Sequence, residues 1–366
     1  MAWSRILGHD GVIERLCESI ERGRLSHAYL FVGPDGIGKE LLARELAKAL
    51  LCARNTREAC DQCPSCQKTE HGNHPDVAFV RRAERTALSP QPPLRSRRGG
   101  AGVRGRTQIV IGQVREEIQE PIAYKAFEGR YKIFVVADAE QMTEEAQNCL
   151  LKTLEEPPPR SLLVLLATRL EPFLDTVVSR CQIVRFRPLA TALVERILIE
   201  GHAVETGLAR VLARLSGGSP GRALRYHREG AYDTASWLLR ELGTMPPGAE
   251  FAVAAELLEK VRTADAPLED ARERVRPVLD LLALAWRDLD FRASGYAEEL
   301  LTWGAGCDTL EMGGRELSAR AARHLTTLAL DARDRLDANA NIKLLLEALL
   351  LETGAVLRGR QALAAR

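Results

Sequence analysis

The sequence predicts an α/β domain built on a parallel sheet, followed by a chain that is helical to its end. After a lead-in helix within residues 1–29, an apolar strand, a glycine-rich loop and a helix follow one another over residues 30–51. Two further apolar runs, 131–136 and 162–167, have the length of strands, and the second has the continuous apolar character of a strand buried on both faces of a parallel sheet. Beyond a Pro-Pro-Gly break at 246–248, leucines recur at helical spacing.

Length and composition are those of a globular protein. The 366 residues are enough for two or three domains, and 46% of them are hydrophobic and 28% charged. The net charge of +1 gives no overall attraction to nucleic acids or anionic membranes, so such contacts would have to be local. No apolar run approaches the ~20 residues of a membrane-spanning helix, and the N-terminus lacks the apolar core of a signal peptide. We therefore expect no membrane contact and a cytoplasmic location.

Residues 30–40, LFVGPDGIGKE, have the spacing G-x-x-x-x-G-K of a phosphate-binding loop. Its glycines would let backbone N–H groups point at an anion, at the positive end of the following helix. They are Gly33, Gly36 and Gly38. Lys39 would reach the outer phosphates of a nucleotide. The next residue should be Ser or Thr, whose hydroxyl completes the shell of a magnesium ion, but it is Glu40.

Four of the eight cysteines follow the helix in the order C-x7-C-x2-C-x2-C: Cys52, Cys60, Cys63 and Cys66. Three thiolates in one tight turn, with a fourth at the helix end, are the donor set that zinc prefers in a closed structural site. The alternative is four unrelated thiols, but cysteine is too rare for this clustering to arise easily by chance. We therefore predict a structural zinc module at 52–66. We interpret the nearby His71 and His74 as surface residues that the site does not need.

Residues 84–106 change composition sharply to proline, glycine, serine and arginine, with little that could be buried. We predict a disordered insertion here. Its arginines allow two interpretations, an arm that touches nucleic acid or a solvated loop, and the lack of aromatic residues that could stack on bases favours the loop. These arginines are Arg95, Arg97, Arg98, Arg104 and Arg106.

Regular structure returns at about Gln108, where a short β-branched run is followed by a helix with apolar residues at helical spacing. The strand at 131–136 then ends in ADAEQMT, at the point where phosphate-loop ATPases carry Asp-Glu. A helix is predicted over 144–154, with its apolar residues facing inward, and the Pro-Pro-Pro at 157–159 stops it because proline cannot continue the hydrogen-bond ladder.

The run AEQMTEEAQNCLLKTLEEPPPRSLLVLLATR at 139–169, followed by Ser-Arg-Cys at 179–181, resembles the AAA+ core of bacterial clamp loader subunits. Together with GPDGIGK and the cysteine cluster, it is most similar to the delta-prime family of DNA polymerase III subunits. The resemblance covers about residues 5–83 and 107–225 well, and the C-terminal third more loosely. It implies an AAA+ phosphate-loop domain, a small helical lid and an all-α collar domain.

Aligned on the Met-Thr that follows it, the family's usual Asp-Glu falls on Ala137 and Asp138. The resemblance thus implies that a magnesium-holding carboxylate is missing, a second defect beside Glu40. A carboxylate at position 40 would sit against the phosphates, where like charges ~4 Å apart cost about 4 kcal/mol at an effective dielectric constant of 20. We expect no hydrolysis, while weak binding of ATP or ADP stays open because Lys39 and the glycines are present. The alternative is an active ATPase with Glu40 and Asp138 as unusual magnesium ligands.

Three further residues take candidate roles from the resemblance. Thr168 matches the position that senses the γ-phosphate from the strand tip, or it is a strand-end threonine without a ligand. Arg180 matches the arginine that projects across a subunit boundary to the neighbour's ATP and stabilises charge on the transferred phosphoryl group. The local sequence alone also allows a surface arginine there. Arg222 lies in a stretch that resembles the second sensor motif, and it contacts a phosphate in its own subunit or packs on the lid.

The predicted organisation is a nucleotide-binding-like core at 1–187, a helical lid at 188–243 and a helical oligomerisation domain, the collar, at 244–366. Asn339 and Asn341 suit the polar start of the last helix. Trp286 and Trp303 are predicted to be core or interface residues, because no cofactor motif surrounds them.

The resemblance implies a non-hydrolysing subunit of the clamp loader, a component of the DNA polymerase III holoenzyme that helps to load the sliding clamp on primed DNA. Its implied partners in a hetero-oligomeric ring are motor subunits of the gamma/tau type and a delta subunit. Through the complex it would also act on the clamp and on primer-template DNA. Besides the active ATPase, a further hypothesis is a zinc-dependent DNA-binding module that uses the arginine-rich insertion.

Overall fold

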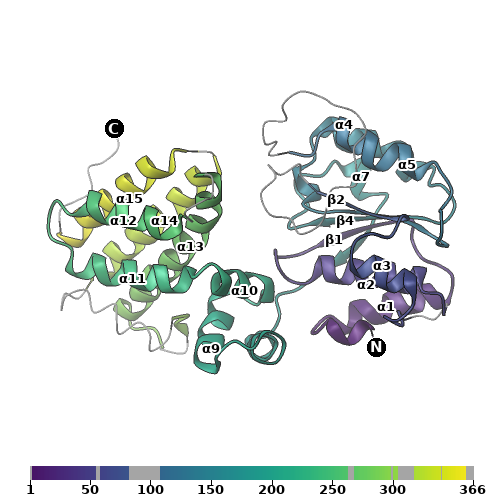
Figure 1. The fold of residues 1–366 in the computed structure, drawn as a ribbon. Helices are drawn as coiled ribbons and strands as arrows, with labels where there is room; N and C mark the ends of the chain where they lie inside the picture. The colour runs from purple at the N-terminus through teal and green to yellow at the C-terminus, as the bar shows by residue number, and fades with distance from the viewer. Residues whose placement is uncertain are drawn as a thin grey trace. The chain divides into compact units, whose positions relative to one another are not determined.

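The computed structural model describes residues 2–54, 58–81, 108–262, 268–297, 300–303, 317–338 and 340–359. The predicted insertion at 84–106 and Asn339 lie outside these residues. The hypothesis that the insertion contacts DNA therefore also falls outside the described residues. The chain divides into two compact units, Met1–Ala190 and Thr191–Arg366 (Figure 1). The predicted collar and all but the first three residues of the predicted lid fall within the second unit.

A five-stranded parallel sheet forms the centre of the first unit, with the strand order β2-β3-β4-β1-β5. The strands are β1 (Ala28–Val32), β2 (Val77–Val80), β3 (Lys132–Val136), β4 (Ser161–Ala167) and β5 (Gln182–Arg185). Every residue of β1 and β4 is buried, as expected for central strands that are covered on both faces. The predicted α/β fold with a parallel sheet is therefore confirmed, and the short strand β2 is an addition to the sequence-based prediction.

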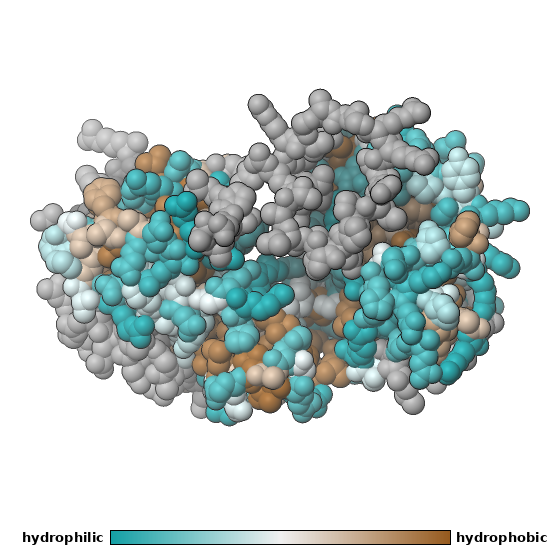
Figure 2. All heavy atoms as spheres, viewed as in Figure 1, coloured by the Kyte–Doolittle hydropathy of each residue, from teal (hydrophilic) through white to brown (hydrophobic). Residues whose placement is uncertain are grey.

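Helices cover both faces of this sheet, with α1, α2 and α3 on one side and α4, α5 and α7 on the other (Figure 1). The first group, preceded by the 3-10 turn η1 (Ala2–Arg5), is α1 (Asp10–Glu21), α2 (Lys39–Leu51) and α3 (Pro64–Glu70). The second side has α4 (Ile111–Val114), the π-helical turn η2 (Arg115–Gln119), α5 (Glu120–Ile122), η3 (Ala139–Gln141), α6 (Glu144–Glu155) and α7 (Asp175–Val178). Hydrophilic side chains cover most of the surface over α1–α3 in the view of Figure 2.

The second unit is helical throughout the residues that the structure describes. It contains α8 (Thr191–Arg196), the π-helical turn η4 (Ile197–Gly201), α9 (Thr206–Leu215), α10 (Pro220–Arg228), α11 (Ala231–Thr244), α12 (Glu250–Val261), α13 (Leu268–Ala293), α14 (Ala319–Asp337) and α15 (Ile342–Leu357). Trp286 and Trp303 are buried, as predicted for core residues. Asn341 caps the last helix, since its side-chain oxygen accepts the N–H of Leu344 at 3.2 Å. Among the described residues, no helix combines the length and the apolarity needed to cross a bilayer.

Candidate functional site

The predicted phosphate loop connects the end of β1 to the start of α2. Gly36 and Gly38 have φ angles of +72° and +105°, which residues other than glycine rarely adopt. Gly38 is also the N-cap residue of α2. Gly33 is required for a different reason, because a Cβ there would lie 2.6 Å from the backbone oxygen of Phe186. The loop therefore has the strand, turn and helix that the motif predicts.

A pocket of about 280 Å³ lies between this loop and the carboxyl ends of β3 and β4. Pairing of β3 with β4, and of β4 with β1, brings the predicted positions Lys39, Glu40, Asp138 and Thr168 to the wall of one cavity. Its full lining is Asp35, Gly36, Gly38, Lys39, Glu40, Leu41, Ala137, Asp138, Glu140, Leu166, Ala167 and Thr168. Four carboxylates and one lysine line this cavity, so its wall carries an excess of negative charge.

The side chain of Lys39 forms hydrogen bonds with the backbone of its own loop. Its ammonium group donates to the backbone oxygens of Gly33 at 2.5 Å and of Pro34 at 2.8 Å, and only 9% of the side chain is exposed. Burial lowers the pKa of Lys39, against the opposing effect of the nearby carboxylates. Two of its three N–H donors are thus used by backbone carbonyls rather than directed into the pocket.

Glu40 is held by two arginines. Its carboxylate pairs with Arg44, one turn along α2, at 3.0 Å, and with Arg81, just beyond β2, at 2.6 Å. The residue that replaces the usual Ser or Thr therefore links α2 to the end of β2. No local pattern indicates Arg81 as its partner, because the two residues lie far apart in the chain.

Thr168 is bound to Glu140, a residue that the sequence analysis did not select. The carboxylate of Glu140 accepts hydrogen bonds from the backbone N–H of Thr168 at 3.1 Å and from its hydroxyl at 2.6 Å. Glu140 follows β3, and Thr168 follows the neighbouring strand β4, so both emerge at the same edge of the sheet. In the sequence, the one feature that could have indicated this pair is that both residues follow predicted strands that lie side by side in the sheet.

Arg222 belongs to the second unit, at the start of α10. Its backbone N–H donates to the hydroxyl of Ser219 at 3.2 Å, which caps the helix. Burial raises the pKa of Asp280 on α13, and the charges of Arg333 and Arg222 act against that rise. Arg222 thus contributes positive charge near a buried carboxyl group of its own unit, and its role as a second sensor stays a prediction.

Arg180 lies just after α7 at the surface of the first unit, with 36% of its side chain exposed. One guanidinium nitrogen, Nη1, donates to the backbone oxygen of Thr176 at 2.9 Å and approaches the hydroxyl of Ser179 at 3.4 Å. The other, Nη2, pairs with Oε1 of Glu155 at the end of α6, at 2.8 Å. The side chain is therefore accessible and also held in one orientation.

The four predicted cysteines meet in one cluster. The sulfur atoms of Cys52, Cys60, Cys63 and Cys66 all lie within 4.8 Å of one another, a spacing that lets them bind one metal ion. Backbone N–H groups donate to two of the sulfurs, from Cys63 to Cys60 at 3.3 Å and from Cys66 to Cys63 at 3.5 Å. Backbone hydrogen bonds lower the pKa of the Cys60 thiol to about 6, so the geometry favours a thiolate there.

A buried ion-pair network attaches this cluster to α2. Lys48, with 1% of its side chain exposed, pairs with Glu45 at 2.8 Å, with Asp61 at 2.7 Å and with Glu70 at 2.9 Å. Arg5 adds contacts to Glu45 at 3.2 Å and to Glu70 at 2.9 Å. Burial acts to lower the pKa of Lys48, but its three hydrogen-bonded carboxylates outweigh that effect and raise it.

The interpretation of His74 as a surface residue is wrong, whereas His71 is exposed as expected. His74 is 2% exposed, and its Nδ1 accepts the backbone N–H of Asp76 at 3.1 Å. The carboxylate of Asp76 in turn accepts the backbone N–H groups of residues 127–129 at 2.6–2.8 Å. That distant loop therefore binds Asp76, the residue to which His74 is itself hydrogen-bonded.

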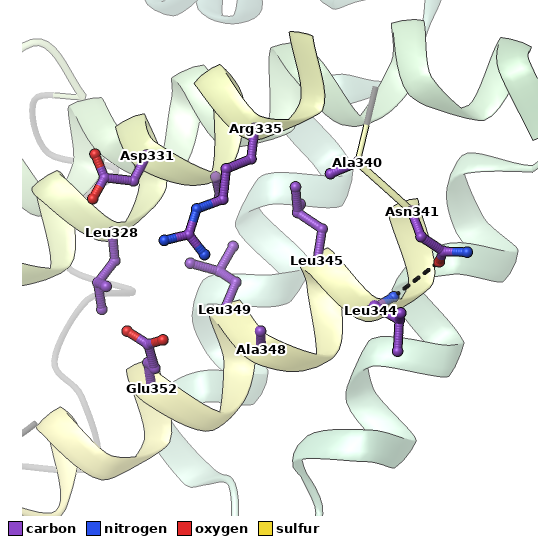
Figure 3. Close-up of a pocket in the computed structure, with 11 residues that line it drawn as sticks. Leu328, Asp331, Arg335, Ala340, Asn341, Leu344, Leu345, Ala348, Leu349 and Glu352 are labelled. Atoms are coloured by element: carbon purple, nitrogen blue, oxygen red, sulfur yellow. Dashed lines mark hydrogen bonds between the residues drawn. The ribbon is translucent and has the colours of Figure 1, made fainter. Parts of the chain in front are cut away.

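A second cavity, of about 300 Å³, lies in the second unit between α14 and α15 (Figure 3). Apolar side chains form much of its wall, with charged groups at its margin. Its lining is Leu328, Asp331, Ala332, Arg335, Ala340, Asn341, Leu344, Leu345, Ala348, Leu349 and Glu352. Leu344 is 65% exposed, so this groove presents an apolar side chain to solvent.

Comparison with known proteins gives the family. A family model described as DNA polymerase III, delta subunit, matches residues 8–190. DNA polymerase III subunit delta' of Bacillus subtilis (strain 168) is 30% identical over 342 residues, which are 93% of this chain and 94% of that protein. DNA polymerase III subunit gamma/tau of Mycobacterium tuberculosis (strain H37Rv) is 30% identical over 255 residues, 67% of this chain and 40% of that protein.

Among solved structures, a DNA polymerase III gamma subunit-related protein of Thermotoga maritima aligns with a TM-score of 0.47 and 17% identity, over 95% of this chain and 99% of the other. The sequence relatives decide the assignment. The chain belongs to the delta-prime family of DNA polymerase III clamp loader subunits. It is accordingly a clamp loader subunit, as the motifs had implied.

Proposed function

We propose that this clamp loader subunit does not hydrolyse ATP and instead supplies Arg180 to the nucleotide site of a neighbouring motor subunit. The observation that carries the proposal is the state of Glu40, which replaces the magnesium-binding Ser or Thr of the motif and pairs with Arg44 and Arg81. Both arginines pair with Oε1 of Glu40, so they offset the negative charge that the active-ATPase alternative needs on Glu40 as a magnesium ligand.

The charge of the pocket supports the same conclusion. Asp138 and Glu140 line the pocket beside the single ammonium of Lys39, while the charge of the third carboxylate, Glu40, is offset by its two arginines. Each carboxylate within ~4 Å of a phosphate would cost about 4 kcal/mol at an effective dielectric constant of 20. Binding of ATP or ADP is therefore proposed to be weak and to need displacement of Lys39 from the carbonyl groups of its own loop.

Arg180 suits a role in trans because it is exposed and oriented. A guanidinium that reaches a neighbour's γ-phosphate stabilises charge that develops on the transferred phosphoryl group. Supplying it from the next subunit makes hydrolysis depend on assembly. The fold of the phosphate-loop domain is then needed in this chain to present Arg180, rather than to use Lys39. Thr168, bound to Glu140, has no sensing role in this proposal.

The partners proposed for this chain are motor subunits of the gamma/tau type and a delta subunit in a hetero-oligomeric ring. Its action on the sliding clamp and on primer-template DNA takes place through that complex, in the cytoplasm. A reducing compartment agrees with four cysteines held close together as candidate ligands instead of paired in disulfides.

We further propose that the metal held by the cysteine cluster is zinc. Four thiolates form a complete tetrahedral set for zinc, which leaves no open position for a substrate and gives the site a structural role. The cluster extends from the end of α2, at Cys52, to the first turn of α3, at Cys66, so the metal would fix the connection between these helices. This also leaves His71 and His74 without a ligand role.

The helices of the second unit are proposed to include the collar that joins this chain to its neighbours. The groove between α14 and α15 supports this, because it offers apolar contact area with charged residues at its margin. An apolar helix of a neighbouring clamp loader subunit fits that chemistry. Leu344→Glu should then weaken complex formation, whereas Thr327→Glu, at an exposed position of α14 outside the groove, should not.

The test is ATPase activity of a reconstituted complex with its motor subunit. Arg180→Ala should leave assembly intact and lower turnover at least tenfold, since arginine fingers contribute about 10³–10⁵ to kcat. Arg24→Ala, a change of an exposed arginine elsewhere, should leave turnover unchanged. Lys39→Ala should also have no effect on turnover. Normal turnover in an intact Arg180→Ala complex would refute the proposed role, and a loss with Lys39→Ala would favour the active ATPase.

A further inference from the structure

The geometry points to Glu155 as the residue that positions Arg180 for its action on a neighbouring subunit. This inference rests on the proposed trans role of Arg180. Arg180 has a long side chain with many rotamers, and of the three acceptors found among the described residues, Thr176 and Ser179 belong to its own segment. Glu155 is the acceptor from another element, the end of α6.

The carboxylate of Glu155 is well placed for this task because its helix is firmly fixed. Thr143 caps the start of α6 through a hydrogen bond to Ala146, and the apolar side of the helix is buried against the sheet. Gln147 then ties α6 to the segment before α7, since its amide donates to the oxygen of Pro172 at 2.9 Å and accepts the N–H of Leu174 at 2.8 Å. The two ends of the ion pair therefore sit on elements that are connected to each other.

The remaining donors of Arg180 stay available to a ligand. A guanidinium group has five N–H donors in one plane. Nη2 gives one to Glu155, and Nη1 is used by Thr176 and approaches Ser179, so within the described part of the chain the Nε–H and the second N–H of Nη2 remain. Holding the planar group from one side in this way leaves its other edge for a phosphate oxygen, with the two-point geometry that arginine favours.

The ion pair is exposed, with 36% of the Arg180 side chain and 52% of the Glu155 side chain accessible. Exposed pairs contribute little to folding. Loss of Glu155 should therefore change the orientation of Arg180, and with it the turnover of the neighbour, without a measurable effect on the stability of this chain.

The experiment measures ATP turnover of the reconstituted clamp loader complex. Glu155→Ala should lower kcat three- to tenfold, with unchanged KM for ATP and unchanged complex formation. Glu155→Gln should stay within twofold of the parent, because the amide oxygen still accepts from Nη2. Glu156→Ala removes the same charge from the adjacent exposed residue and should have no effect. In a complex that already carries Arg180→Ala, Glu155→Ala should cause no additional loss.

The outcomes separate the inference from the proposal beneath it. If Glu155→Ala turns over as fast as the parent while Arg180→Ala is slow, Glu155 does not position Arg180, although the trans role stands. An equal loss with Glu155→Gln, or an additional loss in the Arg180→Ala complex, likewise overturns the inference. If Arg180→Ala itself has full activity, the trans role fails and the role of Glu155 fails with it.

Discussion

Replacement of Lys48 by methionine is expected to destabilise the first unit strongly. The ammonium group of Lys48 is almost fully buried and contacts carboxylates of Glu45, Asp61 and Glu70 at 2.7–2.9 Å. Methionine keeps most of the side-chain volume but removes the charge. Glu45, with 0% of its side chain exposed, would then keep Arg5, at 3.2 Å, as its one ion-pair partner among the residues that the structure describes. Burial raises the pKa of Glu45, which shows how poorly this site tolerates an unpaired carboxylate.

The size of the effect follows from the burial of the pair. Removing one partner of a buried ion pair costs about 3–5 kcal/mol, since the other charge is left without compensation. The remaining contact with Arg5 places Lys48→Met toward the lower end, about 3 kcal/mol. For a unit of this size that corresponds to a fall of the melting temperature by roughly 6–12 °C. The cysteine cluster should also lose its metal more readily, because Asp61 lies between Cys60 and Cys63 and would no longer be anchored.

Urea denaturation followed by circular dichroism measures this change. The matched control is Lys68→Met, because Lys68 pairs with Glu128 at 2.6 Å but is 39% exposed, so its loss should cost less than about 1 kcal/mol. Adding Glu45→Gln to Lys48→Met should recover part of the stability by removing the unpaired charge. If Lys48→Met and Lys68→Met have the same stability, the buried network does not support the fold as argued.

The other predictions concern the metal site, a buried carboxylate and the phosphate loop. Cys63→Ser should lower bound zinc, measured by atomic emission, to well under half, because a hydroxyl is a poor replacement for a thiolate. Asp76→Asn should cost about 2 kcal/mol at pH 7. Burial opposes ionisation of Asp76, but three backbone N–H groups outweigh that effect and lower its pKa. The stability that the Asp76 carboxylate contributes is therefore present above pH 3.8 and is lost as the pH falls. Acid titration of the parent protein and of Asp76→Asn measures this difference. Glu40→Thr should leave the isolated chain without ATPase activity, because the position of Ala137 still lacks a carboxylate; magnesium-dependent turnover would contradict this.

The elements that the sequence predicted best are those with strong local patterns. Strands β3 and β4 follow from apolar runs, and the turn before α2 follows from glycines that the backbone requires. Strand β2 has only four residues, too few to show a clear alternation of apolar and polar side chains. The sharp change of composition that follows it in the sequence also hides it. The burial of His74 was missed for another reason, since its neighbour Asp76 is bound by a loop at 127–129 that lies far away in the chain.

The candidate site shows the same division between local motifs and distant partners. The sequence identified Lys39, Glu40 and Arg180 because each lies in a recognisable motif. It did not identify the partners, Arg81 and Glu155, because nothing in a local pattern selects one exposed charge among many. Ion pairs between distant segments are decided by the packing of the elements that carry them, and this packing becomes visible only in the folded chain.

The glycines of the phosphate loop have a structural reason that does not depend on nucleotide. Gly33 is required by the backbone of Phe186, and Gly36 and Gly38 by their positive φ angles. Lys39 likewise has partners within the loop, where its ammonium group satisfies two carbonyl oxygens. A chain that no longer hydrolyses ATP would therefore still keep G-x-x-x-x-G-K in order to fold. The positions that distinguish a working site are those that would hold magnesium. In this chain they are Glu40, which binds two arginines, and Ala137, which has no ligand atom.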